Sequence, residues 1–130
     1  LFIDLDGFKS VNDTWGHDAG DAVLKETANR LRESVRGTDT VARIGGDEFL
    51  AVITDLQNRD NAEAIAKKIL GSLAEPFIVS HTSVRIGASI GIALFPRGKQ
   101  DDVESLIKLA DQAMYGVKKS GKNGIRFADE

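Results

Sequence analysis

The sequence predicts an α+β fold built on a ferredoxin-like central antiparallel sheet that is flanked by helices. Short apolar runs alternate with segments that carry apolar residues at helical spacing, and the resulting order of elements is β-α-β-β-α-β-β-α-β. The first six elements match the split β-α-β arrangement. The chain has 130 residues, 42% hydrophobic and 28% charged, which suffices for one globular domain with a proper core. We therefore expect residues 1–130 to form a single domain.

The first half of the chain begins with a buried strand that runs into an acidic loop. A polar stretch at residues 12–21 is expected to be turn-rich, and a helix follows because apolar residues from Leu24 to Val35 recur on one face. A second helix ends shortly before Pro76. The expected strands are Leu1–Asp4, Thr40–Ile44 and Glu48–Ile53, and the expected helices are Ala19–Val35 and Asn61–Ala74.

The second half of the chain opens with a predicted hairpin. Its arms are Phe77–Ser80 and Ser83–Leu94, with residues 81–82 in the turn. The second arm alternates apolar residues with smaller or polar ones, and this period of two indicates a strand. A helix at Val103–Lys119, a glycine-rich break and a last strand at Ile125–Phe127 complete the chain.

This topology predicts a common location for several acidic residues. In a ferredoxin-like sheet the third strand lies beside the first and runs antiparallel to it. The end of the first strand is then next to the start of the third, which brings Asp4 close to Asp47 and Glu48. We expect a cluster of carboxylates at this end of the sheet.

The turn before the third strand is the most informative segment. Residues 43–49 read RIGGDEF, so two glycines that free the backbone for a tight turn are followed at once by two carboxylates. Hairpin tips of this kind more often carry Asn-Gly or Asp-Gly. Paired carboxylates at an open turn suit a divalent metal beside a phosphate.

A second dense polar segment lies at residues 4–21. It contains five aspartates, a lysine and an asparagine. Taken alone, it is equally well explained as a solvated loop in which Asp and Asn cap helices. Together with the acidic turn, it favours a functional site.

Composition limits the classes of ligand. A net charge of −3 argues against a nucleic-acid surface, so a nucleotide ligand would need metal ions and a few local lysines. The chain has no cysteine, which excludes disulfides, thiol catalysis and zinc–cysteine sites. No apolar run approaches the roughly 18 residues that span a bilayer, so we expect no membrane contact from this domain itself.

Three segments match one known set of motifs. Residues 4–21 fit the pattern D-x-D-x-F-K-x-x-N-D-x-x-G-H-x-x-G-D at every fixed position, residues 110–123 are similar to A-D-x-A-M-Y-x-A-K-x-x-G-R-N, and residues 89–93 read SIGIA. With the GGDEF turn, they make the whole chain resemble the GGDEF family of diguanylate cyclases. Lys122 replaces the usual Arg, which keeps the charge and loses the bidentate fork, and Val117 replaces a smaller Ala.

The resemblance implies a metal site and a catalytic group. Asp4, the Leu5 carbonyl and Asp47 would ligate Mg²⁺ or Mn²⁺, hard cations that prefer oxygen ligands. Glu48 would either join the metal site or deprotonate a 3′-hydroxyl, and these two alternatives stay open. The implied catalytic residues are Glu48, Asp47 and Lys9.

The resemblance also implies a GTP site. Asn12 and Asp21 would read the guanine edge, because Asp accepts hydrogen bonds from the ring N–H and the amino group. The basic residues would face the triphosphate, although a lysine at a helix end is otherwise explained by the helix dipole. The implied substrate-binding residues are Phe8, Asn12, Asp21, Gly45, Gly46, Lys118 and Lys122.

A separate pair, Arg36 and Asp39, matches the R-x-x-D of the family's inhibitory product site at the right distance before Gly45. Arg36 can clamp phosphate or stack on guanine, and Asp39 can accept from a guanine edge. The alternative is a surface salt bridge that contributes little. At this position in the sequence we favour the product site.

The predicted function is therefore that of a diguanylate cyclase with a polymerase-palm-like, nucleotidyl-cyclase-like core. It would condense two GTP to cyclic di-GMP and pyrophosphate as a homodimer, with inhibition by the product and without a nucleic-acid partner. The main alternative is a module that binds GTP or cyclic di-GMP and regulates an attached EAL phosphodiesterase or other domain. A weaker alternative is another palm-type nucleotidyl cyclase or polymerase.

The resemblance finally implies a setting for the chain. It implies a bacterial cytoplasmic domain, either free or as the cytoplasmic part of a membrane-bound sensor. The family usually has a helix before the first strand, and this chain starts at Leu1 without it. We expect the chain to be excised from a multidomain protein.

Overall fold

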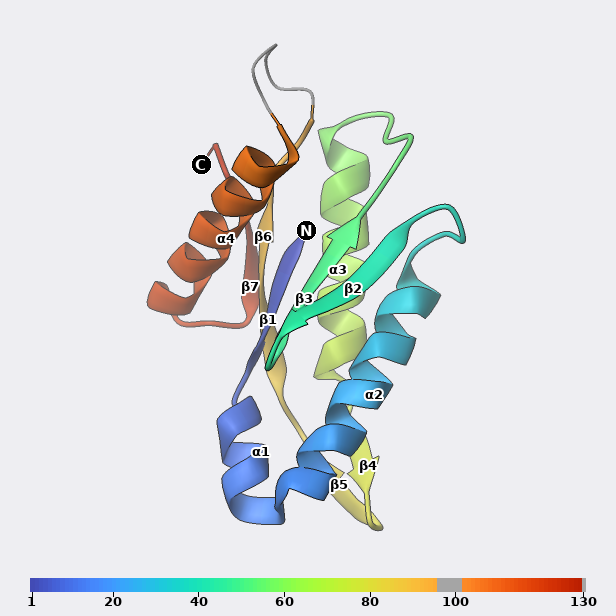
Figure 1. The fold of residues 1–130 in the computed structure, drawn as a ribbon, viewed down its shortest axis with the longest axis vertical. Coiled ribbons are helices and arrows are strands. Elements are labelled where there is room, and N and C mark those ends of the chain that lie inside the picture. The colour runs from blue at the N-terminus through green and yellow to red at the C-terminus, as the bar shows by residue number, and fades with distance from the viewer. Residues whose placement is uncertain (96–101, 130) are drawn as a thin grey trace.

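A computed structural model describes residues 1–95 and 102–129, which form a five-stranded sheet with helices on both faces (Figure 1). Its strands are β1 (Phe2–Asp6), β2 (Thr40–Gly45), β3 (Glu48–Val52), β4 (Phe77–Val79), β5 (Thr82–Val84), β6 (Gly87–Ile92) and β7 (Gly124–Phe127). Its helices are α1 (Phe8–Trp15), α2 (His17–Ser34), α3 (Arg59–Ala74) and α4 (Val103–Lys119). None of the helices in this part of the chain has the length and apolar character needed to cross a membrane.

The strand order of the main sheet is β2-β3-β1-β6-β7. The first four strands pair antiparallel, and β3 lies beside β1 as the sequence predicts. The edge pair β6 and β7 is parallel, because α4 carries the chain back across the sheet between them. Helices α2 and α3 pack together on one face, and α4 covers the other (Figure 1). The predicted fold class is confirmed.

Strand β1 sends alternate side chains to the two faces of the sheet. Ile3 and Leu5 are fully buried in the larger core cluster, which also holds the apolar residues of α2 and α3. Phe2 points to the opposite face and packs with Ala110 and Met114 of α4. The same alternation directs the two aspartates of β1 toward α4.

Helix α4 lies unusually close to β6. A Cβ atom on Gly91 would overlap the backbone carbonyl oxygen of Ala110 and lie 2.5 Å from the backbone N of Met114. Only glycine fits here without moving the helix. This contact fixes the height of α4 above the sheet, and with it the position of the polar residues in its last turn.

Helix α1 corrects the sequence analysis, which expected residues 12–21 to be turn-rich. The stretch instead contains the end of α1 and the start of α2, which meet at Gly16. Gly7 and Gly16 have left-handed φ values of 82° and 92° and delimit α1. Within α1 only Val11 is buried, so the apolar periodicity was too weak to reveal a helix.

The predicted hairpin arm at residues 83–94 is also corrected, because it is divided between two sheets. Its first part is β5, which pairs with β4 alone, whereas β6 joins the main sheet beside β1. Ser80 and His81 have φ values of 49° and 67°, the left-handed pair that a tight two-residue hairpin requires. The predicted sixth element therefore forms a small separate hairpin, and β6 takes its place in the ferredoxin-like order.

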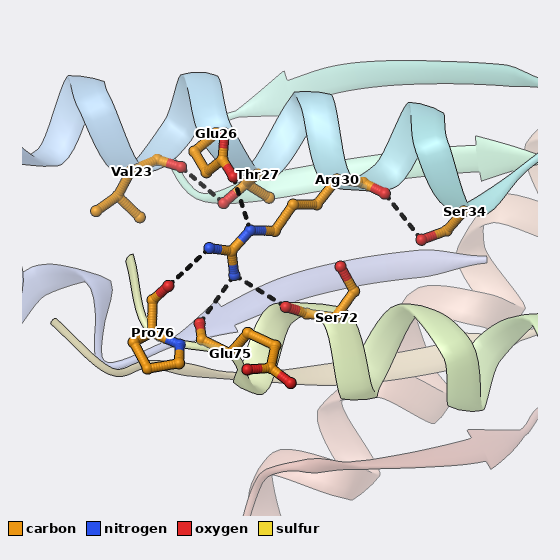
Figure 2. Close-up of polar contacts among 8 residues, drawn as sticks. All are labelled: Val23, Glu26, Thr27, Arg30, Ser34, Ser72, Glu75 and Pro76. Atoms are coloured by element: carbon orange, nitrogen blue, oxygen red, sulfur yellow. Dashed lines mark hydrogen bonds and ion pairs between the residues drawn. The ribbon is translucent and has the colours of Figure 1, made fainter. Parts of the chain in front are cut away.

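Arg30 joins α2 to the end of α3 through its guanidinium group (Figure 2). Its side chain is 13% exposed and forms an ion pair with Glu26 at 3.0 Å. Three of its four remaining N–H groups donate to backbone carbonyl oxygens, those of Ser72 at 2.9 Å, Glu75 at 2.8 Å and Pro76 at 2.8 Å. The guanidinium carbon also lies 3.8 Å from the centre of the Phe77 ring. The carbonyls of Glu75 and Pro76, just beyond α3, thereby gain a donor, and the Ser72 carbonyl gains a second donor besides the Glu75 N–H.

Candidate functional site

The acidic residues of β1 and β3 meet at one end of the sheet. Asp4 pairs with Glu48 across the two strands, and the Leu5 N–H donates to the Asp47 carbonyl oxygen at 3.1 Å. Asp4 therefore lies beside Asp47 and Glu48, although more than 40 positions of the sequence separate it from them, and these three residues are called the acidic edge below. Their predicted proximity is confirmed.

The pKa of Asp4 shows the effect of this arrangement. Burial first, and the nearby charge of Asp47 second, raise the pKa of Asp4 from 3.8 to about 6, although the Lys118 ammonium opposes the shift. Glu48 adds a smaller effect in the same direction as Asp47. Beyond the effect of burial, the raised pKa of Asp4 thus reflects repulsion among the carboxylates at this edge.

Lys118 places a positive charge beside these carboxylates. It lies in the last turn of α4, one helical turn beyond the packed Met114, so it reaches the same face of the sheet. Its Nζ is 3.2 Å from Asp4 Oδ1, 2.7 Å from Asp6 Oδ1 and 3.3 Å from the Leu5 carbonyl oxygen. Burial alone would lower the pKa of Lys118, but the hydrogen bond to Asp6 and the charges of both aspartates raise it.

The oxygen atoms at this edge include those that the sequence predicts as metal ligands. Within residues 1–95 and 102–129, no group of three or more acidic or histidine side chains is arranged to hold a metal ion. Mg²⁺ needs only one or two carboxylates, because water and substrate phosphates complete its octahedron. Asp4, Asp47 and the Leu5 carbonyl offer that limited set, and Lys118 already places a positive charge against Asp4 and the carbonyl.

The structure gives a different reason for glycine at residues 45–46 from the backbone freedom that the sequence suggested. Neither Gly45 nor Gly46 has a left-handed φ, so the turn does not depend on that freedom. A Cβ atom on Gly45 would lie 2.8 Å from Glu48 Oε1, whereas one on Gly46 would meet nothing within 4 Å. Gly45 therefore leaves room for the Glu48 carboxylate to fold over the turn.

The residues predicted to read guanine lie where α1 and α2 pack together. Asn12 is half-buried on α1, and Asp21 is exposed in the first turns of α2. A Cβ atom on Gly20 would overlap Asn12 Oδ1 and would lie 3.2 Å from Phe8 Cζ. The missing side chain at Gly20 thus makes the seat for Asn12, and it brings Phe8, Asn12 and Asp21 into one neighbourhood.

The other predicted basic residues lie on the surface around this edge. Lys9 is exposed in the first turn of α1. Lys122 is exposed in the loop between α4 and β7, where it has a left-handed φ of 66°. The neighbouring Asn123 donates its backbone N–H to Asp6 Oδ2 at 2.8 Å, which ties that loop to the acidic edge.

A comparison with protein families decides the membership of this chain. The family described as "Diguanylate cyclase, GGDEF domain" matches residues 1–124. The chain belongs to the GGDEF family. The match includes the turn and the acidic edge described above, so this GGDEF domain has the family motif in the expected place in the fold.

Its relatives include curated proteins and solved structures. The bifunctional diguanylate cyclase/cyclic di-GMP phosphodiesterase MucR of Pseudomonas aeruginosa is 49% identical over 127 residues, which are 98% of this chain and 18% of MucR. The diguanylate cyclase TpbB of the same species is 42% identical, over 99% of this chain and 30% of TpbB. This GGDEF domain therefore spans less than a third of these relatives.

Solved GGDEF domains have the same fold. The crystal structure of the TpbB GGDEF domain matches with a TM-score of 0.92 at 41% identity, over 97% of this chain and 78% of that one. The GGDEF domain of DgcB from Caulobacter crescentus, solved in complex with c-di-GMP, matches with a TM-score of 0.89 at 28% identity, over 99% of this chain and 76% of that one.

The Arg36–Asp39 turn lies at the opposite end of β2 from the GGDEF turn. The Asp39 side chain is 1% exposed, and its carboxylate accepts from the backbone N–H of Arg36 at 2.9 Å and of Thr54 at 3.0 Å. Burial would raise the pKa of Asp39, but these hydrogen bonds and the Arg36 charge lower it overall. Arg36 is 56% exposed and donates to the Thr54 carbonyl oxygen. The ion pair of the alternative interpretation is present, and product binding stays a prediction.

Sequence reasoning missed two residues that shape this GGDEF site, Asp6 and Gly20. Asp6 was counted among the aspartates of residues 4–21 without a role, because the first strand was expected to end at Asp4. Strand β1 continues to Asp6, and alternation then puts both aspartates on the α4 face. Extending the period of two by one step would have revealed it.

Proposed function

We propose that this GGDEF domain is a diguanylate cyclase that condenses two GTP into cyclic di-GMP and two pyrophosphates. The observation that carries the proposal is the intact acidic edge, where Asp47 and Glu48 of the turn lie beside Asp4, with Lys118 next to them. The family membership and the cyclase named TpbB support it.

The predicted site residues would have the following roles. Asp4, Asp47 and the Leu5 carbonyl would hold Mg²⁺ or Mn²⁺ together with the GTP phosphates, where the bound ion would neutralise developing charge. Lys118, Lys9 and Lys122 would add positive charge around the triphosphate. Phe8, Asn12 and Asp21 would hold and read the guanine, and Gly45 and Gly46 would let the backbone approach the phosphates.

Each domain would bind one GTP, so two domains must face each other as a homodimer. The 3′-oxygen of one GTP forms a bond to the α-phosphorus of the other, the bond from that phosphorus to the bridging oxygen breaks, and pyrophosphate leaves. Glu48 would accept the 3′-hydroxyl proton or, in the open alternative, join the metal site. A second, symmetric transfer closes the ring.

A second candidate function is a regulatory module that binds GTP or cyclic di-GMP for an attached domain. The bifunctional name of MucR favours it, because there the matched segment is 18% of a larger protein. The unaltered GGDEF turn favours the cyclase. For control by the product, we propose that cyclic di-GMP binds at Arg36 and Asp39, and the DgcB complex with c-di-GMP supports binding of that ligand by this fold.

The deciding experiment is incubation of the purified protein with GTP and Mg²⁺, followed by identification of products by liquid chromatography and mass spectrometry. The proposal expects cyclic di-GMP and pyrophosphate, with a specific activity that rises with protein concentration. Binding of GTP without turnover would support the regulatory module instead. A rate that does not depend on concentration in a demonstrated monomer would contradict the dimeric mechanism.

A further inference from the structure

Asp6 is a buried carboxylate whose contacts join four elements of the fold. It lies at the end of β1, and the residue is 8% exposed. Ser89 of β6 donates to its Oδ1 at 2.9 Å, and the Asn123 N–H, in the loop before β7, donates to its Oδ2 at 2.8 Å. Lys118 of α4 donates to the same Oδ1 at 2.7 Å. Both oxygens are therefore used, and a charged partner takes the shorter bond.

Lys118 divides its charge between this aspartate and Asp4. The contact to Asp6 is the shorter one, at 2.7 Å against 3.2 Å. The two aspartates differ in what else they do, because Asp4 belongs to the proposed metal ligands and Asp6 does not. Asp6 is instead fixed by the Ser89 hydroxyl and the Asn123 amide, so it has no freedom to turn away.

From this geometry we infer that Asp6 is the positioning residue that holds Lys118 at the phosphate side of the GTP site. The inference rests on the proposed function. When a metal ion takes Asp4, Lys118 loses one of its two anionic partners and keeps the other. Asp6 thus keeps the ammonium at the edge while it faces phosphate. Without Asp6, Lys118 would pair with Asp4 alone and compete with the metal for it.

The test is a double-mutant cycle on nucleotide binding, with Asp6→Asn, Lys118→Ala and the combination. Asn keeps the size of the side chain and removes its charge. The probe is α,β-methylene GTP, which cannot complete the transfer, titrated in the presence of Mg²⁺ by calorimetry. Asp6→Asn should weaken binding roughly 10- to 100-fold, the usual range for residues that orient a binding group. In the Lys118→Ala background the same change should weaken binding less than about threefold, because the residue it positions is gone.

A second readout separates positioning from folding. The Mg²⁺ concentration needed for half-maximal binding of the probe should rise in Asp6→Asn, because Lys118 then holds Asp4. Asn58→Ala is the matched control, since it removes the N-cap of α3 away from the edge and should leave both readings unchanged. Thermal unfolding verifies that every variant is folded before titration.

The outcomes separate the positioning role of Asp6 from the proposed nucleotide site itself. Additive losses in the cycle, or unchanged affinity and unchanged Mg²⁺ dependence in Asp6→Asn, would refute the positioning role and leave the nucleotide site intact. Failure of the unmodified protein to bind the probe at all would refute the nucleotide site, and the role of Asp6 with it.

Discussion

Arg30 with its partners and the acidic edge are both built around charged side chains, but they differ in how far those charges are paired. Arg30 meets an ion-pair partner and three carbonyl oxygens, so its charge is paired and four of its five N–H groups are used (Figure 2). Its guanidinium carbon also lies over the Phe77 ring. Asp4 faces two other carboxylates and has one cation, and its pKa is raised to about 6. The first region stabilises the fold, whereas the second retains negative charge that a bound cation would relieve.

This difference predicts that function and stability respond to different substitutions. Changes at the edge should affect turnover more than unfolding, and changes at Arg30 should do the reverse.

The largest effect is expected at the GGDEF turn. Asp47→Asn and Glu48→Gln should each reduce cyclic di-GMP formation by on the order of 10³-fold. Each substitution removes a carboxylate that is proposed to bind the metal ion or to accept the 3′-hydroxyl proton. The free energy of unfolding should change little, since both residues lie at an open turn. Steady-state turnover and urea unfolding measure the two quantities, and near-normal turnover in either variant would show that its assigned role is wrong.

Arg30→Ala should give the opposite result. It removes the donors of three carbonyl oxygens, so the free energy of unfolding should fall by about 2–4 kcal/mol. Turnover per folded molecule should stay close to that of the unmodified domain. Arg32→Ala is the matched control, because Arg32 lies on the same helix and bonds to exposed Asn29 Oδ1. If the two variants were equally stable, Arg30 would not be the anchor described here.

The guanine-reading pair should show an intermediate effect. Asn12→Ala or Asp21→Ala should reduce discrimination between GTP and ATP by about 1–3 kcal/mol, the cost of losing hydrogen bonds to the base. Gly20→Ala should act in the same direction, because its methyl group would displace the Asn12 side chain. Competition binding of the two nucleotides measures this, and an unchanged preference in all three variants would remove them from base recognition.

Arg36→Ala tests whether a region far from the edge communicates with it. It should raise the inhibition constant of cyclic di-GMP roughly tenfold, within the usual range of coupling between sites. Initial rates without product should remain similar. Asp39→Ala should raise the constant too, but it also removes an acceptor for the Thr54 N–H, so Arg36→Ala is the cleaner variant. Identical inhibition curves would leave Arg36 and Asp39 as a surface pair.

The smallest effect is a gain in stability at Asp4. Because the folded pKa of about 6 lies above the ordinary 3.8, the folded state holds the proton more tightly, and stability falls as pH rises between these values. Asp4→Asn should remove that loss and stabilise the metal-free domain by about 1 kcal/mol above pH 6, after allowance for solvent screening. The gain should vanish below about pH 4. Urea unfolding in a chelator at the two pH values tests this, and a destabilised variant at high pH would contradict it.

The sequence was sufficient to place the third expected strand beside the first, and with it to bring Asp4 to the GGDEF turn, because strand topology determines which strand ends are neighbours. It was insufficient for α1, whose ends are set by left-handed glycines and which buries only Val11. The sequence also did not reveal that residues 83–94 are divided between two sheets. Strands of either sheet have the same alternation of apolar and polar residues, so the pattern does not mark the boundary. The seat that Gly20 makes for Asn12 depends on the packing of two helices, which no local pattern encodes.

The long separations within the Asp6 cluster have a consequence for synthesis. Asp6 meets Lys118 and Asn123 across 112 and 117 positions of the sequence, so its partners are synthesised long after Asp6 itself. A nascent chain that stops before Lys118 carries the whole GGDEF turn and every proposed metal ligand, yet it lacks the ammonium that lies against them. The contacts of Lys118 at this edge can therefore form only after more than a hundred residues beyond Asp6 have been translated.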